Sequence, residues 1–475
     1  MTQRILILGG GFAGMSVARE LTALLRHDGR LAEPGAASTP EAGAPAARPG
    51  DGRERVAIQL VDRDDYFVFQ PLLADLLSST VEATHVVVPL RRMLPDVSVA
   101  VGLVERIDTT ARRVHLRRPL DGAPFELGYD ALVIALGGVT DLDVVPGLRE
   151  HALGFRTLGD AFFLRNRALR MLEAARVERD ETQRARLLTF VVVGGGSTGV
   201  EAAASLHDLL AAAAATFHDT ELRPRVVLVH GHETLLPHLG RRLGRVTVRR
   251  LRDVGVELIL GHHVKRVAED HVELDDGRRI ETATVVSTVG NAPNPVLQDL
   301  PTRHDHRGWP QPEPTFALPG LDRVWALGDC ASIVDPATGR PMAATAQFAV
   351  REGPHCARNV LAALDGQPQS PFRYRSQGML VSLGRHRAVG DVLGVKVSGL
   401  LGWFLWRTYY LLRLPSLDRR VRVAMDWALD LFLPRDVVEI DVRRTRSSRA
   451  VGPGRNGQAD DAAERGRSDL TVGTS

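Results

Sequence analysis

Two glycine-rich turns in this chain have the residue types and the spacing that bind the pyrophosphate of a dinucleotide. Each follows an apolar strand and leads into a helix-forming run. The glycines are Gly9, Gly11 and Gly14 in the first turn and Gly194, Gly196 and Gly199 in the second. The first glycine lets the chain turn, the second lets the backbone approach the anion, and the third lets the helix pack closely on the strand. One such turn is a weak signal, but two in strand–turn–helix context predict two nucleotide cofactors.

The residue that ends the next strand of each unit predicts how a ribose is held. Asp62 ends the strand 56–61, and a carboxylate there accepts hydrogen bonds from ribose hydroxyls. His230 ends the corresponding strand of the second unit, where a carboxylate would repel a 2′-phosphate and a histidine would not. Glu233 could take this role instead, or His230 could be a solvated loop residue. The choice between NADH and NADPH therefore stays open.

The composition is ordinary for a folded soluble protein of two or three domains. The chain has 475 residues, of which 44% are hydrophobic and 25% charged. A formal net charge of +3 is too near balance to argue for a nucleic-acid partner. Cys330 and Cys356 form no CxxC motif, so we expect neither a disulfide framework nor a dithiol redox centre. No His/Cys/Asp cluster stands at ligand spacing, so no metal is expected. No signal peptide opens the chain, so we expect it to stay in the cytoplasm.

The segments between these motifs predict several further elements. Residues 26–55, rich in Ala, Pro and Gly, have the composition of a mobile surface insertion. Apolar spacing predicts a helix over 159–185 and another over 341–364. Asp329 ends a strand and is placed to hold hydroxyls of a bound flavin. Residues 443–475, charged and poor in aromatic residues, are predicted to be disordered.

Two segments near the C-terminus predict helices that lie in a membrane surface without crossing it. Residues 397–414 are apolar but are interrupted by Arg407 and Arg413, and their tryptophans and tyrosines favour the water–lipid boundary. Residues 416–433 are amphipathic. The expected apolar face is Leu417, Val421, Ala424, Ala428 and Leu431, opposite Arg419, Arg422 and Asp426. Alternatively, the helices bury their apolar face in a dimer interface or against the core, and both can be true.

Seven motifs, in this order, resemble those of the type II NADH dehydrogenases, which are single-subunit NADH:quinone oxidoreductases of the two-dinucleotide-domain flavoprotein superfamily. They are GGGFAG (9–14), FQPLL (69–73), DALVIALGG (130–138), GGGSTGVE (194–201), ALGDCA (326–331), TAQFA (345–349) and WFLWRTYYLLRLP (403–415). The resemblance covers nearly the whole chain, to about residue 441. It is much more specific than either glycine turn taken alone.

The resemblance implies an α/β fold with two Rossmann-like dinucleotide-binding domains, an FAD domain interrupted by an inserted NAD(P)H domain, followed by C-terminal amphipathic helices. The implied divisions are 1–155 for the first part of the FAD domain, 156–305 for the NAD(P)H domain, 306–370 for the second part of the FAD domain, 371–442 for the membrane-interface region and 443–475 for the tail.

The resemblance also implies a role for individual residues. The adenosine half of FAD would be held by Gly9, Gly11, Gly14 and Asp62, and its ribityl–phosphate region by Asp329. The pyridine nucleotide would be held by Gly194, Gly196 and Gly199, with His230 at its ribose. Gln70 would lie near the flavin, Glu201 would face the nicotinamide, and Ala346 and Gln347 would line the quinone pocket. Arg351 departs from the family pattern, because relatives usually carry a second glutamine there, and a cation would change the polarity of the quinone channel.

The expected activity is hydride transfer from NADH, or NADPH, to FAD and then transfer of two electrons to a membrane quinone, without proton pumping. The expected enzyme is a homodimer that binds the cytoplasmic side of the membrane peripherally. A soluble reductase of a small iron–sulfur protein is one alternative, although it should lack the amphipathic helices. A flavin-binding interaction protein without turnover is another. Disulfide reductases and sulfide:quinone reductases depend on cysteines that this chain does not have.

Overall fold

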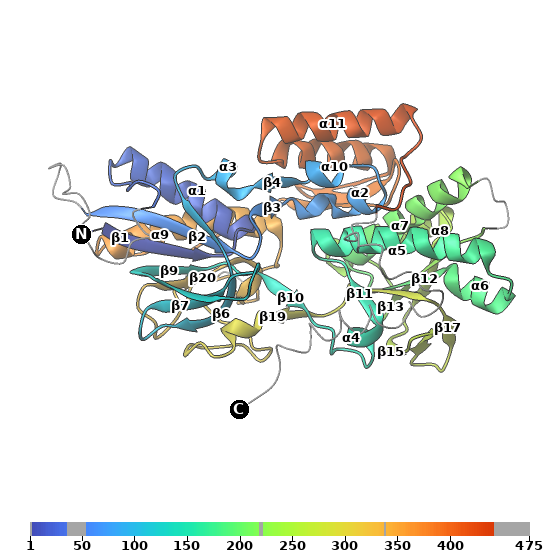
Figure 1. Cartoon of the computed structure of the whole chain (residues 1–475), viewed down its shortest axis with the longest axis horizontal. Coiled ribbons are helices and arrows are strands. Elements are labelled where there is room, and N and C mark those ends of the chain that lie inside the picture. The colour runs from blue at the N-terminus through green and yellow to red at the C-terminus, as the bar shows by residue number, and fades with distance from the viewer. Residues whose placement is uncertain (1, 36–53, 218–221, 337–338, 441–475) are drawn as a thin grey trace, which may run out of the picture. The chain divides into compact units, whose positions relative to one another are not determined.

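The first domain contains a five-stranded parallel sheet built from segments far apart in the sequence (Figure 1). In this computed structural model the described residues are 2–35, 54–217, 222–336 and 339–440, and a compact unit extends to Val438. The strand order is β20-β9-β1-β2-β5. These strands are β1 (Thr2–Leu8), β2 (Arg55–Asp62), β5 (Ser98–Val101), β9 (Ala131–Ile134) and β20 (Val324–Ala326). Because β20 pairs with β9, the chain leaves this domain and returns to it. This confirms the prediction that a second domain is inserted into the first.

Helices α1 (Phe12–His27) and α9 (Ala346–Leu364) pack against each other over this sheet. Gly353 allows the close approach, because a Cβ at this position would lie 2.5 Å from the Cβ of Ser16. The central strands carry apolar residues on both faces, as expected of a parallel sheet covered on both sides. The first glycine turn therefore emerges at the carboxyl edge of a rigid sheet.

The second domain repeats this plan with a parallel sheet of order β11-β18-β12-β13-β14. Its strands are β11 (Ala152–Gly154), β12 (Thr189–Val193), β13 (Arg225–His230), β14 (Glu257–Leu260) and β18 (Thr284–Ser287). Its helices are α5 (Leu158–Val177), α6 (Glu181–Leu187), α7 (Ser197–Thr216) and α8 (Gly240–Asp253). Two antiparallel segments, β10 (Gly138–Thr140) and β19 (Asn291–Pro293), join the domains. Because β11 pairs with β18, the second sheet includes three residues that lie before the predicted boundary at 155.

Smaller elements surround the two sheets, and α10 packs on β22 near the C-terminus. The antiparallel strands are β3 (Tyr66–Val68), β4 (Val87–Pro89), β6 (Leu103–Asp108), β7 (Arg113–Arg117), β8 (Pro124–Gly128), β15 (Val264–Val267), β16 (His271–Leu274), β17 (Arg279–Glu281), β21 (Gly378–Ser382), β22 (Ala388–Val392) and β23 (Val395–Ser398). The remaining α-helices are α2 (Leu73–Leu77), α3 (Leu90–Met93), α4 (Leu148–His151), α10 (Gly399–Arg413) and α11 (Leu417–Phe432). The short 3₁₀ segments are η1 (Gln70–Leu72), η2 (Ala83–His85), η3 (Pro237–Leu239), η4 (Pro295–Leu297) and η5 (Gly328–Cys330).

Two predicted helices have different bounds. The helix expected over 159–185 is two helices, because Asp180 accepts the peptide N–H groups of Thr182 and Gln183 and starts a new helix. The helix expected from residue 341 begins at Ala346, because the peptide N–H of Met342 pairs with the carbonyl of Ile333. Most of the predicted insertion (36–53) and the whole predicted tail (443–475) lie outside the described residues.

Candidate functional site

The first glycine turn is held by Asp62 on the neighbouring strand. Gly9 has a φ of +103°, and a Cβ at Gly14 would lie 1.9 Å from the carbonyl oxygen of Gly9, so both positions require glycine. The peptide N–H of Gly10 donates to Asp62 Oδ2 at 2.5 Å. Burial raises the pKa of Asp62, and two peptide N–H groups that donate to its carboxylate oppose this rise. A Cβ at Gly11 would meet nothing within 4 Å, so open backbone at the start of α1 fits the phosphates of FAD.

The second turn reproduces this geometry with a histidine in place of the carboxylate. Gly194 has a φ of +113°, and a Cβ at Gly199 would lie 1.9 Å from the carbonyl oxygen of Gly194. A Cβ at Gly196 would meet nothing within 4 Å. The peptide N–H of Gly195 donates to His230 Nδ1 at 3.1 Å. A cavity of about 240 Å³ opens beside the turn, and its lining includes Val193, Gly194, His230, Gly231, His263 and Val289. This cradle fits a second dinucleotide.

The turn that carries Asp329 lies against the first cradle, because a Cβ at Gly328 would lie 2.9 Å from the Cβ of Ala13 in α1. Asp329 is half-buried, and burial raises its pKa, while Arg156, with Nη2 3.5 Å from Asp329 Oδ2, lowers it. The peptide N–H of Gly328 donates to Glu352 Oε2 at 2.8 Å, and burial raises the pKa of Glu352 to about 7. Neither Arg156 nor Glu352 was singled out from the sequence, and only the fold places them here.

Glu201 lies in the second turn of α7, largely covered by the C-terminal segment of the chain. Its Oε1 accepts the peptide N–H of Ser382 in β21 at 3.0 Å. Burial raises the pKa of Glu201 to about 8, the Ser382 N–H and the indole of Trp406 lower it, and the carboxylate of Asp75 raises it. Burial and the nearby Glu201 also raise the pKa of Tyr410. The Glu201 carboxyl is therefore protonated at neutral pH and can give or take up a proton.

The raised pKa of Glu201 makes the stability of the folded protein depend on pH. Because the folded state binds this proton more tightly than the unfolded state, stability falls as the pH rises from about 4.5 to about 8. Glu201→Gln removes this titration and can still accept the Ser382 N–H. We expect this variant to match the parent at pH 5 and to exceed its stability at pH 8 by about 2 kcal/mol, less than the full shift because the side chain is partly exposed. Thermal unfolding at both pH values measures this, and an unchanged pH dependence would mean that Glu201 ionises normally.

The first residues of α9 face the segment that leads into β21. Ala346 begins the helix, and the side-chain amide of Gln347 is fixed on both sides. Its Nε2 donates to the carbonyl of Gly378 at 3.3 Å, and its Oε1 accepts the hydroxyl of Ser376 at 3.2 Å. The structure therefore places Gln347 between the FAD domain and the C-terminal region.

Arg351, one turn further along α9, does not point freely into a channel. Its guanidinium carbon lies 4.6 Å from the ring centroid of Tyr374, and Nη2 donates to Gln377 Oε1 at 3.1 Å. This cation is therefore stacked and hydrogen-bonded at the edge of the segment that fixes Gln347.

Gln70 is exposed, and the neighbouring Phe69 makes the contacts that place this segment. The Phe69 ring lies 5.8 Å from the ring of Phe12 in α1 and 6.2 Å from that of Tyr410 in α10. The segment therefore connects the first cradle with the surroundings of Glu201 through Tyr410.

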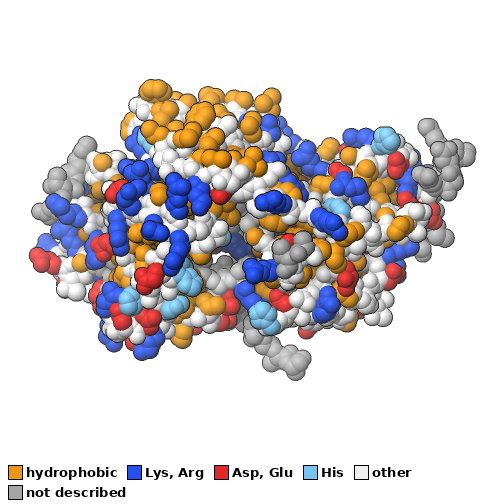
Figure 2. Space-filling view, turned by 180° about the vertical axis from the view of Figure 1, so that it is seen from behind, with side chains coloured by type: hydrophobic (Ala, Val, Ile, Leu, Met, Phe, Trp, Pro, Cys, Tyr) orange, Lys and Arg blue, Asp and Glu red, His pale blue; other side chains and the backbone are white. Residues whose placement is uncertain are grey.

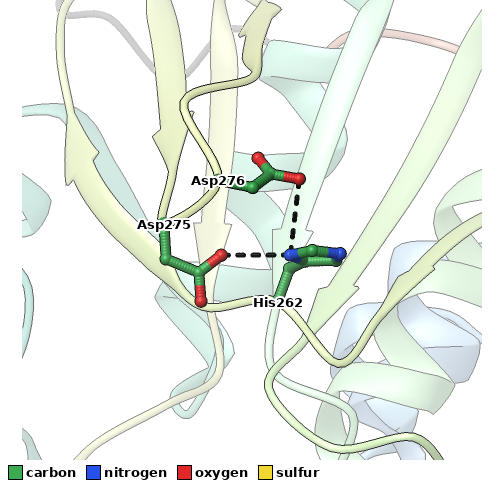
Figure 3. Close-up of side chains that lie close together, drawn as sticks. All are labelled: His262, Asp275 and Asp276. Atoms are coloured by element: carbon green, nitrogen blue, oxygen red, sulfur yellow. Dashed lines mark hydrogen bonds and ion pairs between the residues drawn. The ribbon is translucent and has the colours of Figure 1, made fainter.

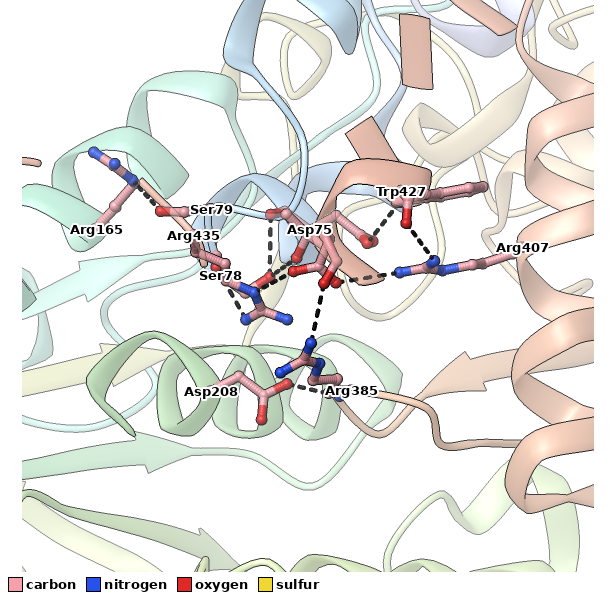
Figure 4. A network of polar contacts seen from close by, with 11 residues as sticks. Asp75, Ser78, Ser79, Arg165, Asp208, Arg385, Arg407, Trp427 and Arg435 are labelled. Atoms are coloured by element: carbon pink, nitrogen blue, oxygen red, sulfur yellow. Dashed lines mark hydrogen bonds and ion pairs between the residues drawn. The ribbon is translucent and has the colours of Figure 1, made fainter. Parts of the chain in front are cut away.

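A buried set of charges, which the sequence pattern did not predict, fixes the C-terminal helices (Figure 4). The Arg407 side chain is only 12% exposed, and its guanidinium carbon lies 4.2 Å from the Trp403 ring centroid and 4.8 Å from that of Trp427. Asp430 accepts from Arg435 Nε at 2.6 Å and lies 3.8 Å from Arg407 Nη2. An arginine flanked by tryptophans in an apolar helix was the available signal for this buried cation.

Asp75 extends this set into α2. Trp427 Nε1 donates to Asp75 Oδ1 at 3.2 Å. Burial raises the pKa of Asp75 to about 6, and Arg407 lowers it. On the other side, Arg385 Nη2 donates to the carbonyl of Asp430 in α11 at 3.0 Å, and the peptide N–H of Arg385 donates to Asp208 of α7 at 2.7 Å. These contacts attach α10 and α11 to helices of both halves of the fold (Figure 4).

The outward side of α10 and α11 is an apolar surface, which we call the C-terminal apolar face (Figure 2). Its exposed residues are Leu400, Leu401, Phe404, Leu412, Leu417, Val421, Met425, Leu429, Leu431, Phe432 and Leu433. The buried side of α11 is formed by Val423, Trp427 and Asp430, so the side of α11 predicted to be apolar faces outward. Asp426, on the opposite side, lies 2.6 Å from His85 Nδ1, so it faces the rest of the protein. Among the described residues no helix has the length and apolar character to cross a bilayer.

A histidine and two aspartates come together in the second domain, although sequence spacing did not reveal them (Figure 3). His262 Nδ1 lies 3.1 Å from Asp275 Oδ1 and 3.4 Å from Asp276 Oδ2. Arg278 Nε donates to Asp276 Oδ2 at 2.6 Å, and the peptide N–H of His263 donates to Asp275. The carboxylates are already paired, and these contacts hold the loop beside the second cradle.

The cysteines are free and fully buried. Burial raises the pKa of Cys330 to about 12 and that of Cys356 well above its usual value. Neither thiol is a reactive thiolate.

Comparison with known proteins agrees with this geometry. Residues 3–353 match the model of the pyridine nucleotide-disulphide oxidoreductase family, and residues 376–436 match that of the NDH2 C-terminal domain. The demethylphylloquinone reductase NdbB of a Synechocystis species is 32% identical over 89% of this chain and 95% of that protein. The type II NADH:quinone oxidoreductase NdhA of Mycobacterium tuberculosis is 30% identical over 90% of this chain and 86% of that protein.

Solved structures show the same fold. The structure of NDH2 from Plasmodium falciparum in complex with NADH has a TM-score of 0.78 and 16% identity, and it covers 92% of this chain and 99% of that one. The matched family models and the curated relatives, which span nearly the whole chain, assign its membership. The chain belongs to the pyridine nucleotide-disulphide oxidoreductase family and, within it, to the type II NADH:quinone oxidoreductases.

Proposed function

We propose that the protein oxidises NADH by means of bound FAD and delivers two electrons to a membrane quinone without pumping protons. The observation that carries this proposal is the pair of matching cradles, one completed by Asp62 and Asp329 and the other opening on a cavity of about 240 Å³. Family membership and the relatives named as NADH:quinone oxidoreductases support the same activity.

FAD, when bound, supplies the two-electron chemistry between the nicotinamide and the quinone. The residues proposed to hold its adenosine half are Gly9, Gly11, Gly14 and Asp62, with Asp329 at its ribityl–phosphate region. Those proposed to hold the nicotinamide dinucleotide are Gly194, Gly196, Gly199 and His230. Glu201, protonated at neutral pH, would hold a proton near the nicotinamide. Gln70 would lie near the flavin, and Ala346 and Gln347 would line the quinone pocket, with the amide of Gln347 oriented by Gly378 and Ser376.

Steady-state oxidation of NADH by the purified flavoprotein, with and without a short-chain quinone, tests this function. We expect the flavin to be bleached by NADH and the turnover to rise strongly when quinone is added. Bleaching without acceleration by any quinone would favour the soluble reductase of an iron–sulfur protein. A flavin that NADH does not bleach would favour an interaction protein without turnover.

We also propose that the C-terminal apolar face attaches the protein peripherally to the cytoplasmic side of the membrane, and that the protein is a homodimer. We further propose that the domain boundaries lie at residues 155, 305, 370 and 442. Ten large apolar side chains exposed on two adjacent helices, with Leu433 directly after them, exceed the scattered apolar residues of an ordinary soluble surface. Their removal from water by lipid would stabilise the bound state, and it would bring the protein to a lipid-soluble acceptor.

Two acidic substitutions in the C-terminal apolar face are expected to release the protein from lipid. In the variant Leu401→Glu/Phe404→Glu, two side chains that are 61% and 62% exposed become charged, so binding to liposomes should fall at least about tenfold. Co-sedimentation measures this. The control is Leu120→Glu, at a leucine that is 96% exposed on another part of the protein, where binding should not change. If the double variant still sedimented with liposomes but lost its dimer, the face would be a subunit interface instead.

A further inference from the structure

The two nucleotide cradles of this chain differ in the group that ends the strand beside them. Asp62 and His230 occupy equivalent positions. Each accepts the peptide N–H of the second glycine in a run of three, Gly10 for Asp62 and Gly195 for His230. A carboxylate at this position accepts a hydrogen bond from the ribose 2′-hydroxyl and repels a 2′-phosphate.

The contact with Gly195 decides which atom of His230 carries the proton. Nδ1 accepts the peptide N–H of Gly195 at 3.1 Å, so in the neutral ring the proton is on Nε2. Burial, followed by His232 and His263, lowers the pKa of His230, so the ring is neutral at physiological pH. His230 Nε2 is buried and has no hydrogen-bond partner among the described residues. It is an N–H donor where the family pattern has an acceptor.

Two further imidazoles lie around His230. The His232 ring lies 5.2 Å from the His230 ring, at 82° to it, and the His263 ring lies directly over Gly231, where a Cβ would be 2.2 Å from its Cε1. His230, Gly231 and His263 line the same cavity of about 240 Å³. Three imidazoles thus meet at the ribose end of the second cradle.

Two of the carboxylates of this region are held by other partners. Asp275 and Asp276 face His262, and Arg278 donates to Asp276. Glu233 is exposed and lies over Gly261 at the end of β14, where a Cβ would be 2.5 Å from its Oε1. Because Glu233 is an exposed acid close in sequence to His230, the test must separate the two.

We propose that His230 is the specificity-determining residue of the pyridine-nucleotide site and that it makes the site accept NADPH as well as NADH. The Nε2–H can donate to a ribose hydroxyl oxygen or to a 2′-phosphate oxygen, so it favours neither nucleotide by repulsion. This inference rests on the proposed function, because it assumes that the second cradle holds the nicotinamide substrate.

The test replaces His230 and measures binding separately from turnover. ADP-ribose and its 2′-phosphate are titrated calorimetrically into the full-length flavoprotein, and kcat/KM is measured for NADH and NADPH. In the parent we expect the two dissociation constants to lie within about tenfold of each other. In His230→Glu, which can still accept the Gly195 N–H, the 2′-phosphate form should bind at least about tenfold more weakly while ADP-ribose binding is kept. The NADPH-to-NADH ratio of kcat/KM should fall by the same factor.

Two further variants make the outcome decisive. His230→Gln, which is neutral and can both donate and accept, should keep the parent's preference. Glu233→Gln should leave the preference unchanged. The proposal is overturned if the parent rejects the 2′-phosphate form, or if Glu233→Gln rather than His230→Glu changes the preference. ADP-ribose and its 2′-phosphate bind without flavin reduction or quinone. If both bound as expected but the activity assay failed, the result would count against the proposed function and not against this inference.

Discussion

Gly196→Val is expected to give a yellow protein whose flavin NADH cannot bleach. Gly196 ends the second glycine turn at the N-terminus of α7, with a φ of −73° that valine adopts without strain. A Cβ there would meet nothing within 4 Å, so the fold should tolerate the substitution. The added side chain would instead occupy the space that the pyrophosphate needs. We expect the rate of flavin reduction, measured by stopped-flow absorbance, to fall about a hundredfold or more, since even a small displacement of the reacting groups has such effects.

The matched control is the same substitution in the other cradle. Gly11 has a φ of −72° and an equally open Cβ position, so Gly11→Val should also fold. This variant should lose FAD and be colourless, whereas Gly196→Val keeps it. If Gly196→Val were bleached at the parent rate, the second turn would not hold the nicotinamide nucleotide. If Gly11→Val were yellow, the assignment of the two cradles would be reversed or wrong.

The parts of the site that could be predicted from sequence depend on local backbone geometry. At Gly9 and Gly194 the chain turns with positive φ, and at Gly14 and Gly199 a Cβ would collide with a carbonyl oxygen. The spacing of the glycines therefore predicts the close contact between helix and turn directly. Asp62 could be placed because it ends a strand that must pair beside the turn. These features need only a few consecutive residues and one parallel pairing to be inferred.

The parts that could not be predicted depend on contacts between distant segments. Trp427 and Asp75 are 352 positions apart, and Glu201 and Ser382 are 181 apart, so no local pattern records either hydrogen bond. Amphipathic spacing correctly gave α11 an apolar side but left open whether this side faces a membrane, a dimer partner or the core. Arg407 and Asp430 occupy the inner contact, so the apolar side faces outward. In sequence, Arg407 interrupts an apolar helix, whereas in the structure its burial against Trp403 and Trp427 makes it the point of attachment.

The attachment of α10 and α11 should therefore be lost when Arg407 is replaced. In Arg407→Leu the buried Asp430, whose side chain is 3% exposed, loses one of its two cations, and Asp75 loses the charge that lowers its pKa. Removing one partner of a buried ion pair costs about 3–5 kcal/mol, so we expect a decrease of this size in the free energy of unfolding, measured by thermal or urea unfolding. The control is Arg413→Leu on the same helix, where the exposed guanidinium lies over the Tyr409 ring and the decrease should be below about 1 kcal/mol. Adding Asp75→Asn to Arg407→Leu removes the Asp75 carboxylate, which has lost its nearby cation. The asparagine keeps an acceptor for Trp427 Nε1, so part of the stability should return. Equal losses in the two arginine variants would mean that the buried charges do not fix these helices.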